Sequence, residues 1–149
     1  MSHEEIYYTL ALQKIDGVGD IVAKKLLQHC GNAEAIFKEK PSNLSRIDGV
    51  GSILLKNLKD KSVFEKAQEE LKFIEENDIS VAFFQDENYP ERLKHCIDSP
   101  ILLFSSGNID LNNRRIISIV GTRQITSYGT EFCKKLIEDL LLQTKEPNI

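Results

Sequence analysis

The stretch Ile15-Asp16-Gly17-Val18-Gly19 recurs without a change as Ile47-Asp48-Gly49-Val50-Gly51, thirty-two residues further along the chain. An internal repeat of this kind indicates that one structural unit is used twice. Each copy precedes a short amphipathic stretch, residues 20–30 after the first copy and 52–59 after the second. The repeat therefore predicts two glycine turns, each of which leads into a helix.

The pattern apolar-x-Gly-apolar-Gly between two helices is typical of the helix-hairpin-helix motif. Glycine allows backbone angles that other residues avoid, so the turn is tight and its amides point outward. Together with the N–H groups at the start of the next helix, these amides form a cradle that suits a DNA phosphate and reads no base. The candidate phosphate-binding residues are Gly17, Gly19, Gly49 and Gly51, with Lys24 as an added charge.

Other interpretations of the two turns stay open. Glycines at this spacing can simply end one helix and start the next, and domains of this type also dock other proteins. Three carboxylates near the cradles, those of Asp16, Asp20 and Asp48, weaken phosphate binding there. The sequence does not decide which hairpin matters, nor whether single or double strands are preferred.

The region around the two copies is expected to be entirely helical. Apolar residues recur at helical spacing in three further short segments, 4–12, 33–38 and 42–47. Gly31 stands where the helix over 20–30 would end in a left-handed residue. A longer helix begins at Ser62, where Ser62 and Glu65 have the spacing of a capping box.

Strand-like runs begin after residue 78. Strands are expected over 79–84, 101–104 and 116–120, and the third is mostly apolar, as in strands buried on both faces of α/β sheets. A helix over 127–143 follows. Because such a strand–turn–helix unit needs a further parallel strand, which does not come before Ile149, we expect the sequence to be a piece of a longer protein.

These segments predict a mixed α+β and α/β chain. A small all-helical, SAM-like domain with tandem helix-hairpin-helix motifs is expected over 1–61, followed by a connecting helix over 62–78. Residues 79–149 are expected to form the first, incomplete part of a Rossmann-like α/β domain.

A second candidate phosphate site follows the third expected strand. That strand ends in Gly121-Thr122-Arg123, and Ser127 begins the next helix. Rossmann-like sheets hold phosphate at this place, above a helix start, and a guanidinium offers the paired donors that suit phosphate oxygens. The loop is not the dinucleotide-binding pattern, because Arg123 stands where its second glycine would be. The plainer interpretation is that Arg123 is a solvated loop charge.

Composition limits the kinds of function. The formal charge of −4 and a pI near 5.4 argue against binding of polyanions by bulk attraction. Residues 1–70 hold ten Lys and Arg against eleven Asp and Glu, and residues 71–149 hold nine against twelve, so any contact with nucleic acid must be local. Neither the three cysteines nor the three histidines have metal or catalytic spacing, so no catalytic residue, cofactor or metal is expected. No signal peptide or membrane span is expected, and the cytoplasm is the expected location.

The order of the motifs resembles one family, the DNA-processing A (Smf) family. The motifs that carry the resemblance follow the glycine hairpins and are Tyr89-Pro90-x-x-Leu93, residues 97–103, Gly107-Asn108, residues 119–123 and Tyr128-Gly129. The resemblance implies a non-catalytic cytosolic protein that binds single-stranded DNA during natural transformation, shields it and helps load the RecA recombinase. It also implies that Arg123 contacts phosphate in a basic pocket, beside Gly121, Thr122 and Ser127, and it allows a homodimer of the full-length protein.

Two alternatives to DNA binding remain open. Nucleotide phosphoribohydrolases share a Rossmann-like fold and a glycine-rich phosphate loop, but their Pro-Gly-Gly-x-Gly-Thr-x-x-Glu segment does not occur here. The other alternative is that the helical domain only docks a protein.

Overall fold

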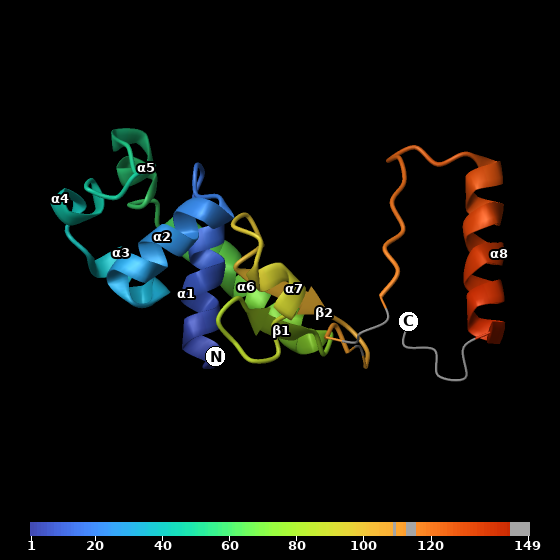
Figure 1. Ribbon diagram of the computed structural model, residues 1–149. Coiled ribbons are helices and arrows are strands. Elements are labelled where there is room, and N and C mark those ends of the chain that lie inside the picture. The colour runs from blue at the N-terminus through green and yellow to red at the C-terminus, as the bar shows by residue number, and fades with distance from the viewer. Residues whose placement is uncertain (109, 113–115, 144–149) are drawn as a thin grey trace. The chain divides into compact units, whose positions relative to one another are not determined.

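The computed structural model describes residues 1–108, 110–112 and 116–143, and it forms two compact units, Met1–Gly107 and Asn108–Ile149 (Figure 1). The domain boundaries predicted at residues 61 and 78 both lie inside the first unit. Its helical and strand segments thus share one contact network.

The first unit begins with six helices, most of them short. Their bounds are α1 His3–Gln13, α2 Asp20–Cys30, α3 Ala33–Lys38, α4 Pro41–Leu44, α5 Ser52–Asn57 and α6 Ser62–Glu76. The helices predicted over 20–30 and 33–38 are confirmed to the residue, and Gly31 ends α2 with φ +89° as expected. The helix predicted over 42–47 is shorter and begins at Pro41, whose fixed φ suits the first position of a helix.

Helix α6 is a core helix of the first unit. It packs against α1, and its side chains at helical spacing, Val63, Ala67, Leu71 and Ile74, are buried. They belong to the same apolar cluster as Leu10 of α1. The segment that the sequence suggested as a connector therefore supplies one wall of the core.

The predicted capping box at the start of α6 is wrong. Lys61 occupies the capping position without a side-chain bond, and Ser62 is the first helical residue. The Asp60 carboxylate accepts both the Ser62 backbone N–H and the Ser62 hydroxyl, each at 2.9 Å. Because Asp60 takes these two donors, the serine is held by the preceding turn rather than by Glu65.

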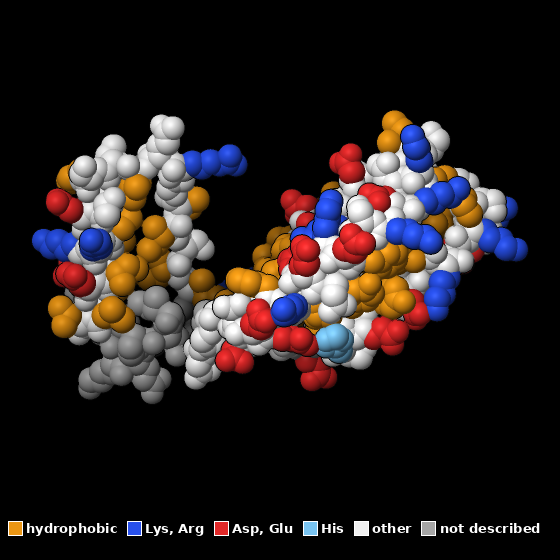
Figure 2. Space-filling view, turned by 180° about the vertical axis from the view of Figure 1, so that it is seen from behind, with side chains coloured by type: hydrophobic (Ala, Val, Ile, Leu, Met, Phe, Trp, Pro, Cys, Tyr) orange, Lys and Arg blue, Asp and Glu red, His pale blue; other side chains and the backbone are white. Residues whose placement is uncertain are grey.

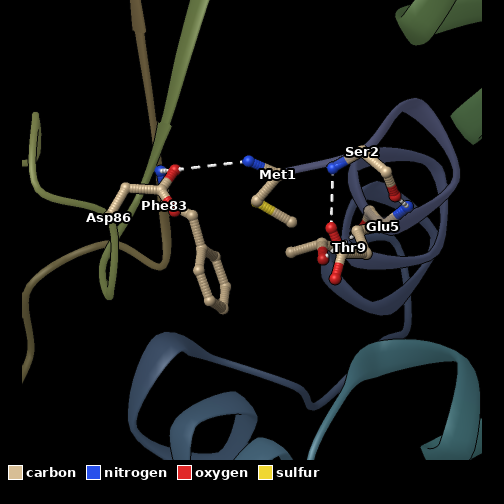
Figure 3. Close-up of polar contacts among 6 residues, drawn as sticks. All are labelled: Met1, Ser2, Glu5, Thr9, Phe83 and Asp86. Atoms are coloured by element: carbon tan, nitrogen blue, oxygen red, sulfur yellow. Dashed lines mark hydrogen bonds and ion pairs between the residues drawn. The ribbon is translucent and has the colours of Figure 1, made fainter.

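A capping box does form at the start of α1, between Ser2 and Glu5 (Figure 3). The Ser2 backbone N–H donates to the Glu5 carboxylate at 2.6 Å, and the Glu5 N–H donates to the Ser2 hydroxyl at 3.2 Å. The backbone N–H of Ser2 lowers the pKa of the Glu5 carboxyl.

The chain's N-terminus lies near Asp86. The Asp86 carboxylate accepts the N–H of Phe83 at 3.1 Å and lies 4.0 Å from the Met1 ammonium (Figure 3). The start of α1 thus lies beside the turn that follows the first strand.

Two strands complete the first unit. Strand β1, Ser80–Phe83, pairs antiparallel with β2, Leu102–Ser105, in a register that places Ser80 opposite Ser105. Helix α7, Glu91–Lys94, lies in the connection between them. Tyr89 of this connection is fully buried, and its hydroxyl donates to the Pro100 carbonyl oxygen at 2.6 Å. That bond ties the segment before α7 to the segment that enters β2.

The second unit contains helix α8, Ser127–Gln143, at the predicted bounds. The third predicted strand is wrong within the described residues. Residues 116–120 form no strand, and Ile117 and Val120 are 71% and 92% exposed. A strand is defined by its hydrogen-bonded neighbour, and no described segment pairs with this one.

Candidate nucleic-acid interface

The two glycine turns have the same backbone conformation. Gly17 and Gly49 have φ values of +90° and +91°, which L-residues with a Cβ rarely adopt. Gly19 and Gly51 then cap α2 and α5 with nearly equal angles, φ −88° and ψ 172° against φ −90° and ψ 175°. All four glycines are exposed. Identical sequence has produced nearly identical local geometry, in which the glycines are exposed while Val50 of the second turn is buried in the core.

The start of each following helix lacks a side-chain cap. Neither Gly19 nor Gly51 can provide one, so the first amides of α2 and α5 are not satisfied by a capping side chain. The surroundings differ, however. Helix α2 begins with Asp20, whose carboxylate accepts the Ile101 N–H at 2.9 Å, whereas α5 has no acidic residue in its first turn. An anion therefore meets less opposing charge at the second turn.

The two copies hold each other through equivalent contacts. The Lys25 ammonium donates to the Asp48 carbonyl oxygen at 3.2 Å, and the Asn57 side-chain amide donates to the Asp16 carbonyl oxygen at 2.9 Å. Lys25 and Asn57 are one repeat apart, as are Asp16 and Asp48. The helix after each turn thus contacts the other turn, as expected of two related units packed about an approximate twofold relation.

Replacing Lys25 with methionine is expected to raise the pKa of the Asp48 carboxyl toward its ordinary value of 3.8. The hydrogen bond from Lys25, 2.6 Å long, lowers this pKa, because it favours the charged form of the acid. The contact accordingly adds stability above the ordinary pKa of Asp48 and loses it as the pH falls through the lowered value. An NMR titration of the Asp48 carboxyl measures the change. Lys24→Met is the control, and an unchanged Asp48 pKa in Lys25→Met would contradict the contact.

The Lys24 ammonium is occupied inside the first unit. It donates to the Ser99 hydroxyl at 2.7 Å and to the carbonyl oxygens of Ile97 and Cys96 at 3.0 and 3.5 Å, and it lies 5.6 Å from the centre of the Phe84 ring. Three acceptors match the three N–H bonds of an ammonium. Lys24 therefore fastens α2 to the segment before β2, and we do not retain it among the proposed phosphate contacts.

The loop Gly121-Thr122-Arg123 lies exposed in the second unit, ahead of α8. The Thr122 hydroxyl donates to the Gln124 carbonyl oxygen at 2.8 Å, so its proton is used within the loop. The Thr126 hydroxyl accepts the Gly129 N–H at 3.1 Å and caps the helix one residue before Ser127. Among the described residues, Arg123 makes no ion pair. The described geometry leaves its guanidinium available to a ligand.

Long-range partners such as Ser99 for Lys24 were missed by sequence reasoning. No spacing rule connects residues seventy-five positions apart, so no signal in the sequence could have predicted this contact.

In the part of the chain that the structure describes, no three His, Cys, Asp or Glu side chains are grouped as metal ligands. Nor is any described helix both long and apolar enough to span a bilayer.

Comparison with known proteins finds a family that is similar to the C-terminal part of the chain. A family model described as DNA recombination-mediator protein A matches residues 80–145, which run from β1 to the end of α8. This segment is therefore similar to the DNA-processing A (Smf) family that the order of the sequence motifs suggested.

Two relatives are similar at modest identity. Protein Smf of Synechocystis sp. is 26% identical over 149 residues, which cover 95% of this chain and 36% of the relative. DNA processing protein DprA of Streptococcus pneumoniae is 36% identical over 55 residues, which cover 37% of this chain and 20% of the relative. The chain therefore spans about a third of the length of the Synechocystis protein. No solved structure matches it.

Proposed function

We propose that this chain binds single-stranded DNA through its phosphates, in a protein that shields incoming DNA and helps load the RecA recombinase during transformation. The supporting observation is the exposed Gly121-Thr122-Arg123 loop, which leads into α8 inside the segment matched by the family of recombination mediators. The preference for single strands and the link to RecA come from the family resemblance. In the same proposal residues 1–61 carry tandem helix-hairpin-helix motifs, and residues 79–149 are the first, incomplete part of a Rossmann-like domain.

The loop suits a phosphate for local reasons. A guanidinium offers two parallel N–H donors, which match two oxygens of one phosphate. The cap from Thr126 satisfies the third amide of α8, the Gly129 N–H, and leaves the amides of Ser127 and Tyr128 for a ligand. Anions are favoured at the positive end of a helix of this length, 17 residues. Backbone amides and one arginine bind phosphate without selecting a base.

Replacing Arg123 with alanine is expected to weaken binding of single-stranded DNA by roughly tenfold or more, because a hydrogen bond to a charged group contributes about 1.5–3 kcal/mol. Binding is measured by titrating the chain into a labelled single-stranded oligonucleotide at low and moderate salt. The affinity of the unchanged chain should fall as salt rises, since bound cations are released from the DNA.

Lys135→Ala is the matched control, because it removes an exposed positive charge from the same unit without touching the loop. Equal losses in both variants would contradict a specific role for Arg123, and no binding by the unchanged chain would contradict the proposed function. Release of a free base from a nucleoside monophosphate would instead support the hydrolase alternative.

A further inference from the structure

A basic segment stands out in this acidic chain, between α3 and α6. Residues 38–61 carry three acidic residues and six basic ones, a formal net charge of +3 in a chain of −4. The basic residues are Lys38, Lys40, Arg46, Lys56, Lys59 and Lys61. A division of the chain at residue 70 hides this segment, because acidic α1 and the acidic first part of α6 fall in the same half. Figure 2 shows Lys and Arg side chains gathered at the end of the first unit that carries α4 and α5.

Most of these cations are exposed and make no ion pair among the described residues. Lys38 is the exception, because it pairs with Glu34 four residues earlier. The side chains without such a pair are those of Lys40, Arg46, Lys56, Lys59 and Lys61. Because these five side chains are charged, exposed and without an ion pair in the described structure, they are available to a negatively charged partner.

The acidic groups of the segment are already engaged. Asp48 accepts from Lys25, Asp60 accepts from Ser62, and Glu39 accepts from the Lys40 backbone N–H at 2.8 Å. These hydrogen bonds lower the pKa of all three carboxyls. Each carboxylate is thus held by a neighbouring donor, and none of the three forms an ion pair with a cation of the segment.

The equivalent lysines of the first copy are used in a different way. Lys14, one repeat before Arg46, pairs with Glu70 of α6, and Lys24, one repeat before Lys56, holds the segment before β2. The first hairpin therefore uses its cations to hold the unit together. At the second hairpin, which has the same turn, Arg46 and Lys56 form no ion pair with any residue that the structure describes.

We propose that the segment 38–61 is the phosphate-binding surface of the first unit, with Arg46, Lys56 and Lys59 as its contacts, and that the first hairpin is structural. This proposal rests on the proposed function, since it assumes that the chain binds DNA. The partner is the phosphate backbone of a nucleic acid. The three cations lie on either side, in sequence, of a turn whose two glycines, Gly49 and Gly51, are exposed. Separate exposed cations around such a turn suit the single phosphate groups of a nucleic acid strand, which each cation can neutralise.

The test is the double variant Arg46→Gln/Lys56→Gln, titrated with the same labelled single-stranded oligonucleotide over a range of salt concentrations. We expect binding at low salt to weaken by about tenfold or more. The slope of log affinity against log salt should become shallower by about 1.4, because each phosphate contact on a single strand contributes about 0.7. Arg46→Lys/Lys56→Arg keeps both charges and should keep the affinity and the slope.

The control variant is Lys72→Gln/Lys94→Gln, which removes the same charge from surface ion pairs elsewhere in the unit. It should change the slope less than the test variant does. Thermal unfolding followed by circular dichroism checks that all variants are folded. If the double variant is unfolded, Lys56→Gln alone replaces it, and its slope should change by half as much.

Two results would overturn the inference. One is an unchanged DNA affinity and slope in Arg46→Gln/Lys56→Gln, with Arg123→Ala still impaired, which leaves the proposed function standing. The other is unchanged DNA binding together with lost binding of poly-glutamate, which would assign the surface to an acidic protein partner. Failure of the proposed function is distinguishable, because the unchanged chain would then not bind the oligonucleotide at all.

Discussion

Replacement of Tyr89 by alanine is expected to lower the free energy of unfolding by roughly 3–5 kcal/mol, the usual cost of deleting a buried aromatic side chain. Tyr89 is 0% exposed, and its hydroxyl bonds the Pro100 carbonyl oxygen at 2.6 Å. The variant loses apolar burial and also leaves that carbonyl without its partner. Urea unfolding followed by circular dichroism measures the difference.

Tyr89→Phe separates the two contributions to this loss. It keeps the ring and removes only the hydroxyl, so we expect a smaller loss of about 1–2 kcal/mol from the unpaired Pro100 oxygen. An equal loss in both variants would show that the hydrogen bond carries the whole effect. No loss in Tyr89→Ala would show that the residue is not buried in solution.

Replacement of Leu71 by alanine is expected to destabilise the chain by roughly 2–5 kcal/mol, because the cavity left in the core cannot fully close. Leu71 is 2% exposed and lies in the cluster shared by α1 and α6. The same urea experiment measures this loss. A loss of this size is the mark of a core helix, whereas a connecting helix would tolerate the change.

Phe73→Ala is the matched control on the same helix. Its side chain is larger but 57% exposed, so we expect a change of about 0.5 kcal/mol or less. If Leu71→Ala were no more harmful than Phe73→Ala, the packing of α6 against α1 would be contradicted.

The two copies show how one sequence can serve two purposes. Five identical residues form the same turn twice, and yet the lysines after the first turn hold the fold, while Arg46, Lys56 and Lys59 around the second form no ion pair within the described part of the chain. The difference arises from what lies beside each turn. Helix α2 contacts the segment before β2 through Lys24 and Asp20, whereas α4 and α5 lie at one end of the unit (Figure 1).

Spacing alone could not distinguish the two capping boxes. Ser2 and Glu5 have the same spacing as Ser62 and Glu65, but only the first pair forms the reciprocal bonds. At the second pair the Asp60 carboxylate lies two residues before Ser62 and takes its donors. A nearby competitor can thus cancel a correct local pattern.

The sequence by itself determined the local structure. Glycine at positions 17 and 49 allows the positive φ that each turn needs, and the apolar spacing set the bounds of α2, α3 and α8. These features depend on interactions among residues a few positions apart, and they can therefore be predicted from spacing. The tertiary structure alone decided that α6 belongs to the core and that residues 116–120 pair with no other described segment. It also decided that Lys24 is engaged, whereas Arg46 makes no ion pair with any described residue. Each of these outcomes depends on a partner distant in sequence, and distance along the chain does not specify which groups the fold brings together.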